Sequence, residues 1–71
     1  MTTLGQQRVR SSFNPSGNDK VAQIKKAAAE LIDLCERMKA DPEKARWSAL
    51  AQTSFEEAAM WAVKAATADK A

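Results

Sequence analysis

A four-residue segment near the middle of the chain, Ala40-Asp41-Pro42-Glu43, constrains the fold more than any other feature. Asp41 is placed to cap a helix, Pro42 suits the first helical position, and Glu43 lies near the positive end of the helix dipole. The segment therefore predicts that one helix ends here and another begins. Because the connection is so short, we expect the two helices to run antiparallel as an αα-hairpin, which makes the fold all-α.

The residues before this segment have the periodicity of an amphipathic helix from about 18 to 40, which either Ser16 or Asn18 can cap. Apolar side chains recur at alternating spacings of three and four, as in a coiled-coil seam. This predicted seam consists of Val21, Ile24, Ala28, Leu31, Cys35 and Met38. Ile32 and Leu34 lie beside the seam and widen the apolar stripe.

The second predicted helix, from about 42 to 67, is apolar around much of its circumference. Residues 58–63 are six consecutive apolar residues, which exceeds a full helical turn. The apolar positions of this helix cannot all face one partner: they are Trp47, Leu50, Ala51, Phe55, Ala58, Trp61, Ala62 and Ala65. A helix that is apolar on several sides is buried on several sides. We therefore expect a helical homo-oligomer, the alternative being an alanine-rich helix that tolerates exposure.

Four side chains of the second helix have more than one interpretation. Arg46 and Trp47 can together present a cation and a stacking surface, but their spacing favours a core tryptophan beside a snorkelling arginine. Trp61 is expected in the core or in an interface. Gln52 either donates a hydrogen bond across an interface or faces water.

The composition argues against an enzyme. The chain has 71 residues, no histidine, a single cysteine and a net charge of +2, which leaves no histidine metal site, no Ser-His-Asp triad and no disulfide framework. We also expect no membrane span and no signal peptide, because no apolar run approaches roughly 20 residues. The carboxylates Asp33, Glu36, Glu56 and Glu57 have spacings typical of solvated helix faces. We therefore predict no catalytic residue, metal or cofactor.

Binding is the better prediction, and it rests on residues 1–17. This segment holds both glycines and shows no periodicity, so it is expected to be an irregular arm before a helical hairpin of residues 18–71. The arm interleaves Arg8 and Arg10 with Phe13 and Asn14. Arginine matches phosphate geometry and an aromatic face can stack on a base. Lys25 and Lys26 could add charge near the same anion. Alternatively, Phe13 only staples the arm onto the hairpin.

Two blocks of the sequence resemble one family of small phage proteins. They are residues 12–18 with 21, 24–25 and 29–34, and residues 49–53 with 56–65, which include the motifs FNP and AMWAVKA. The chain is similar, over roughly residues 6–66, to the phage anti-CBASS cyclic-nucleotide sponges and the related hairpin of the Thoeris anti-defence sponges. The resemblance implies a non-enzymatic protein in the cytoplasm of the infected bacterial host. Such a protein sequesters cyclic oligonucleotide immune signals intact.

The resemblance also implies an assembly and candidate ligand contacts. Relatives form helical hexamers that bind cyclic dinucleotides such as cGAMP between protomers, and some bind cyclic trinucleotides where three protomers meet. The dinucleotide candidates are Phe13 as the stacking ring, Lys26 or Lys25 at phosphate, and Asn14, Arg10 and Arg8 as polar support. For the trinucleotide site, Arg46 matches the family's arginine. Ala28 lies in the stretch where a threonine is expected, so that binding could be weakened or lost.

A second class of function starts from the seam and the basic residues. A small dimeric helical bundle that binds RNA or serves a structural role would have a similar pattern. A net charge of only +2 and the lack of a continuous basic stripe count against it. We expect no DNA partner and no membrane partner.

Overall fold

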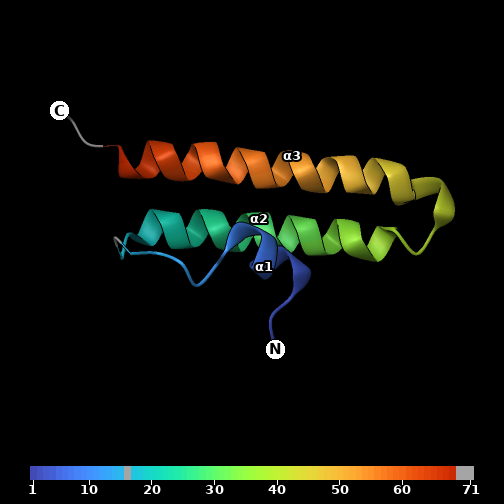
Figure 1. Cartoon of the computed structure of the whole chain (residues 1–71), viewed down its shortest axis with the longest axis horizontal. Helices are drawn as coiled ribbons and strands as arrows, with labels where there is room; N and C mark the ends of the chain where they lie inside the picture. Colours follow the sequence, from blue (N-terminus) through green and yellow to red (C-terminus); the bar gives the residue numbers. More distant parts are fainter. Residues whose placement is uncertain (16, 69–71) are drawn as a thin grey trace.

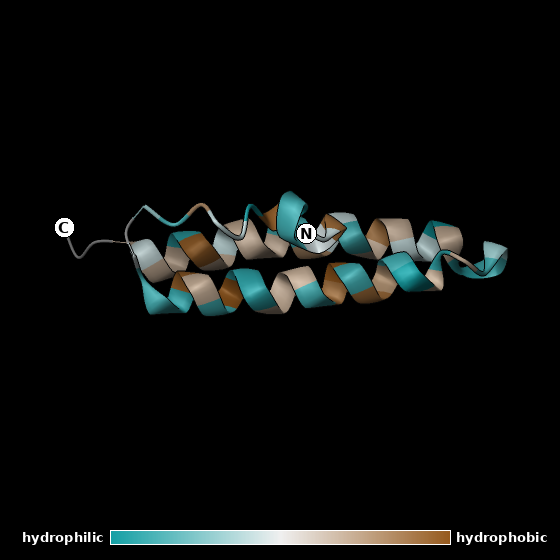
Figure 2. Ribbon diagram, turned by 90° about the horizontal axis from the view of Figure 1, so that it is seen from below, coloured by the Kyte–Doolittle hydropathy of each residue, from teal (hydrophilic) through white to brown (hydrophobic). Residues whose placement is uncertain are grey.

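The computed structural model describes residues 1–15 and 17–68, and in this part the chain is all-α. Its helices are α1 (Leu4–Val9), α2 (Asp19–Met38) and α3 (Pro42–Thr67). Helices α2 and α3 lie side by side and antiparallel, while α1 lies against α2 (Figure 1). This arrangement confirms the predicted hairpin. Figure 2 shows α1 and the segment that follows it on one side of the two long helices.

The hairpin connection is short and capped. The Asp41 carboxylate accepts a hydrogen bond from the Glu43 N–H at 3.0 Å, and Pro42 is the first residue of α3. At the start of α2, the Asn18 side chain caps the helix by accepting from the N–H groups of Lys20 and Val21. Ser16, the other predicted cap, lies outside the described residues. Caps at both starts satisfy N–H groups that have no partner within the helix.

The sequence predicted an irregular arm. That prediction is wrong for residues 4–9, which form α1. A capping box begins this helix: the Gln6 N–H donates to the Thr3 hydroxyl at 3.1 Å, and the Thr3 N–H donates to the Gln6 side chain at 3.0 Å. Arg10 ends the helix in the left-handed region, with φ of 54°. A helix of six residues is too short to show apolar periodicity, so the sequence pattern could not reveal it.

The buried face of α2 differs in register from the predicted seam. Its buried residues are Val21, Lys25, Ala28, Ala29, Ile32 and Cys35. Leu31 and Met38, predicted in the seam, are 42% and 38% exposed, and Ile24 is only partly buried. The predicted seam and the observed buried face share Val21, Ala28 and Cys35. Because α2 packs against α1 as well as α3, the observed face also includes Ile32. Ile32 is completely buried in a core cluster that Val9 joins from α1.

The buried residues of helix α3 are small or polar, and Phe55 packs against the same core while partly buried. Ser48, Gln52 and Ala59 are its buried residues. Gln52, for which the sequence left two roles open, is fully buried and donates to the Ile32 carbonyl and to Glu36, each at 3.0 Å. Trp47 was predicted in the core, and that prediction is wrong because it is 65% exposed on this chain. The small residues allow the two helices to approach closely.

Candidate functional site

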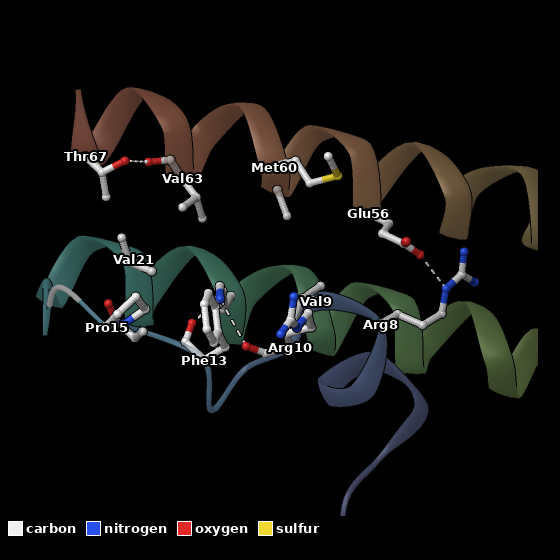
Figure 3. Close-up of a pocket in the computed structure, with 13 residues that line it drawn as sticks. Arg8, Val9, Arg10, Phe13, Pro15, Val21, Glu56, Met60, Val63 and Thr67 are labelled. Carbon is white, nitrogen blue, oxygen red and sulfur yellow. Dashed lines mark hydrogen bonds and ion pairs between the residues drawn. The ribbon is translucent and has the colours of Figure 1, made fainter.

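A cavity of about 610 Å³ lies where the arm passes over the hairpin. Its walls come from three parts of the chain: the arm, the first turns of α2 and the C-terminal half of α3 (Figure 3). The lining residues are Arg8, Val9, Arg10, Phe13, Asn14, Pro15, Val21, Lys25, Glu56, Ala59, Met60, Val63 and Thr67. The cavity therefore combines an apolar wall with several charged side chains, which is the usual character of a small-molecule site.

Phe13 and Arg10 form the outer edge of this cavity. Phe13 is 51% exposed. The Arg10 guanidinium carbon lies 4.4 Å from the centre of the Phe13 ring. This distance is short enough for a cation–π interaction. Together they present an aromatic surface with a positive charge beside it, which suits a base that carries a neighbouring phosphate.

Lys25 lies beneath this edge and is only 7% exposed. Its ammonium donates to the Arg10 carbonyl at 3.0 Å and to the Phe13 carbonyl, and lies 5.3 Å from the centre of the Phe13 ring. Burial, and secondarily the charge of Arg10, lowers the pKa of Lys25 below its ordinary value of 10.5. The sequence offered Lys25 as a phosphate contact, whereas the structure surrounds its ammonium with main-chain oxygens of the arm.

Arg8 joins the arm to α3 through an ion pair. Its Nε lies 2.6 Å from the Glu56 carboxylate, as the dashed line in Figure 3 shows. Both side chains are partly exposed, at 27% and 37%. Polar contacts therefore tie the arm both to α2, through Lys25, and to α3, through Arg8.

The predicted site residues divide into two groups. The structure brings Phe13, Asn14, Arg8, Arg10 and Lys25 together at the cavity. Asn14 also donates from its side-chain amide to the Asn18 carbonyl at 3.0 Å, which ties the arm to the start of α2.

The other three predicted residues lie elsewhere. Lys26 lines a separate, smaller cleft of about 340 Å³ with Ser11 and Asp33. The Arg46 guanidinium carbon lies 5.3 Å from the centre of the Trp47 ring on α3. Ala28 is buried in the core cluster of the hairpin.

Sequence reasoning missed the contribution of α3 to this cavity. Met60, Val63 and Thr67 line it. The first two were considered only as part of an apolar run, and Thr67 only as the end of the second helix. The antiparallel register could have located them, because the end of α3 must pass the start of α2. The Thr67 hydroxyl donates to the Val63 carbonyl at 2.8 Å.

Of the four carboxylates that were predicted to lie on solvated faces, Asp33, Glu36 and Glu56 make specific contacts, and Glu57 is exposed. Asp33 accepts from the Gly5 N–H at 2.7 Å, and Glu56 pairs with Arg8. Hydrogen bonds from Gln52, and then from Lys39, lower the pKa of Glu36 below its ordinary value of 4.5. Within the described ranges, no three histidine, cysteine, aspartate or glutamate residues are grouped to hold a metal ion. Of the helices described, none is long and apolar enough to cross a membrane.

The fold and the cavity define a helical hairpin whose N-terminal arm helps to form a ligand pocket. The family described as Acb2/Tad1, hairpin domain, matches residues 4–67, which is most of the chain. The protein therefore belongs to this family of phage anti-CBASS and anti-Thoeris sponge proteins, as the resemblance predicted. Membership implies a cyclic-nucleotide sponge, and the proteins of this family are known as binding proteins. No curated protein and no solved structure matches the chain.

Proposed function

We propose that this protein binds cyclic oligonucleotide immune signals in the cytoplasm of an infected bacterium and holds them without cleaving them. Cyclic dinucleotides such as cGAMP are the proposed principal ligands. The observation that carries the proposal is that Phe13 and three basic side chains, those of Arg8, Arg10 and Lys25, line one cavity in a member of a sponge family. Sequestration keeps the signal away from its effector, so the defence is not activated.

The residue types that line the cavity match the chemical groups of a cyclic dinucleotide. Such a ligand carries two bases and two phosphates, so it needs stacking surfaces as well as cations. Phe13 supplies a half-exposed ring, and the Arg10 guanidinium lies beside it. Because Phe13 has no phenolic hydroxyl, it contributes stacking without a hydrogen bond of its own. Lys26 remains a candidate phosphate contact for a ligand that extends past Ser11 into the neighbouring cleft.

We propose a homo-oligomer, with a hexamer as the expected state. Large apolar side chains support assembly because they stay exposed on the single chain: Leu31, Leu34, Met38, Trp47, Leu50, Met60 and Trp61. They lie on both long helices, and large exposed apolar patches are typical of interaction sites. Assembly would also allow Lys26 of one copy to reach a ligand held by another.

Cyclic trinucleotides are the second proposed ligand class, with Arg46 as the basic contact. The stretch of α2 around Ala28 has no threonine hydroxyl, and Ala28 itself is only 8% exposed. We therefore expect trinucleotides to bind more weakly than dinucleotides.

Calorimetry with a panel of cyclic di- and trinucleotides tests the proposal, followed by recovery of the ligand after the protein is removed by protease. We expect tight binding of at least one cyclic dinucleotide and recovery of the intact ring. A linear product would show an enzyme instead, and failure to bind any member of the panel would overturn the proposal. Sedimentation adds a second test, because a hexamer agrees with the sponge and a dimer that binds RNA in a salt-sensitive manner favours the alternative.

A further inference from the structure

Lys25 occupies a position where packing alone would favour an apolar residue. It lies between Val21 and Ala28 on the buried face of α2, and it is 7% exposed. Burying an ammonium is unfavourable unless hydrogen bonds compensate for the lost water. In this chain the compensation comes from carbonyl groups of the arm, so the burial of Lys25 and the course of the arm depend on each other.

The two carbonyl acceptors belong to a tight turn of the arm. The Phe13 N–H donates to the Arg10 carbonyl at 2.8 Å, and the Lys25 ammonium donates to that same carbonyl and to the carbonyl of Phe13. Arg10 has a φ of 54°, a conformation that is unfavourable for a residue with a side chain. The ammonium thus holds together the two ends of a turn that includes a strained residue.

The contacts leave Lys25 little capacity for a direct ligand contact. An ammonium has three N–H donors, and two carbonyls of the arm already accept from it. Lys25 instead contacts Phe13, the proposed stacking residue. Its ammonium donates to the Phe13 carbonyl and lies 5.3 Å from the centre of the Phe13 ring. Fixing a binding group in advance raises affinity because less freedom is lost on association.

We propose that Lys25 is a positioning residue, which holds the turn from Arg10 to Phe13 so that the Phe13 ring is presented to the ligand. The inference deepens the proposed function and rests on it. It separates the two lysines that the sequence could not distinguish. Lys25 acts through the arm, whereas its neighbour Lys26 is exposed and lines another cleft.

The first test measures the turn without any ligand. Amide hydrogen exchange of Phe13, followed by NMR, reports the bond to the Arg10 carbonyl. In Lys25→Met, which keeps most of the apolar stem, we expect this amide to exchange at least about tenfold faster while the α3 amides keep their protection. Lys26→Met is the matched control and should leave Phe13 unchanged. If the wild-type Phe13 amide exchanges like an unstructured peptide, the proposal is wrong even if Lys25→Met does not fold.

The second test is a double-mutant cycle on the affinity for the cyclic dinucleotide that the wild type binds best. Lys25→Met and Phe13→Ala should each weaken binding at least about tenfold. The two changes together should weaken it little more than Phe13→Ala alone, because Lys25 acts through that ring. Losses that add in full would show a separate contact and overturn the positioning role. If the wild type binds no cyclic dinucleotide, the proposed function fails while the exchange result still decides whether Lys25 holds the turn.

Discussion

The two sides of the hairpin are built in different ways. On the arm side, polar groups make the long-range links: Lys25 to the arm carbonyls, Arg8 to Glu56, and Asp33 to the Gly5 N–H. On the outward side of α3, Trp47 and Trp61 remain 65% and 62% exposed. The first side presents directed hydrogen bonds and charge, and the second presents apolar area.

This difference indicates separate roles for the two sides. Charged and hydrogen-bonding groups fix geometry and recognise polar ligands, whereas apolar area drives association without strong direction. Trp47 and Trp61 each lie seven residues from Ser54. An antiparallel pair of α3 helices that crosses at Ser54 would therefore place each tryptophan against the other tryptophan of a second copy. We therefore propose that the arm side binds the ligand and that the outer side of α3 contributes to the contacts between copies.

The largest expected effect is loss of assembly when a charge enters the outer side. Trp61→Glu should reduce the sedimenting mass to that of a smaller species, because a carboxylate in an apolar interface loses its water. Ala49→Glu is a matched control, since it adds the same charge to an exposed position on a different face of α3 from the two tryptophans. Equal masses for Trp61→Glu and wild type would mean that this side is not an interface.

The next largest effect should come from the contact between α1 and α2. A Cβ atom at Gly5 would lie 2.1 Å from the Ala29 carbonyl oxygen, a distance that forces the helices apart. Gly5→Ala should therefore lower the free energy of unfolding by about 1–3 kcal/mol, although alanine favours the helical state.

Thermal unfolding measures this change, with Gln7→Ala as the control on the exposed side of the same helix. The arm-side geometry would be less tightly defined than we infer if Gly5→Ala unfolded at the wild-type temperature. The oligomer mass should stay unchanged in both variants, since the change lies on the arm side.

A smaller effect is expected for the ion pair between Arg8 and Glu56. Both side chains are partly exposed, so solvent screens their attraction, and a double-mutant cycle with Arg8→Met and Glu56→Gln should give a coupling of about 0.5–1 kcal/mol. Chemical denaturation at low and high salt measures the coupling, which should fall as salt increases. A coupling near zero at low salt would remove this pair from the contacts that hold the arm.

The smallest expected effect is a change in the stability contributed by Glu36 at acidic pH. Because the folded pKa of Glu36 is lowered, its carboxylate adds stability above the unfolded value of 4.5, and this contribution is lost as the pH falls through the lower folded value. The melting temperatures of wild type and Glu36→Gln should therefore converge as the pH is lowered from 6 through about 4 to about 3. A difference that stayed constant across this range would show that the bonds from Gln52 and Lys39 do not depend on the charge.

The local elements could largely be predicted, and the residues that face one another could not. Asp41 and Pro42 define the start of α3 through local chemistry that no distant contact has to supply. Leu31 was expected to be buried and Ile32 to lie at its side, but the contact with α1 reverses them. Apolar spacing alone allows either Leu31 or Ile32 to face the core of α2. Packing against α1 places Ile32 there.

The candidate site shows the same division. Phe13, Arg10 and Lys25 were identified by residue type, since stacking and phosphate binding need rings and cations. Their arrangement was not identified, because a buried lysine that binds main-chain carbonyls has the same sequence signal as an exposed one. Thr67 was missed because it reaches the cavity only when the hairpin closes.

The amino-acid sequence by itself determined that this protein is a capped helical hairpin with a basic and aromatic arm, because caps, periodicity and side-chain chemistry are local properties. Its sequence likeness also placed it among the cyclic-nucleotide sponges. Only the tertiary structure decided that Gln52 is buried, that Trp47 is exposed and that Lys25 binds the arm. These features follow from the relative rotation and approach of three helices, which depend on the sum of many weak contacts between distant residues.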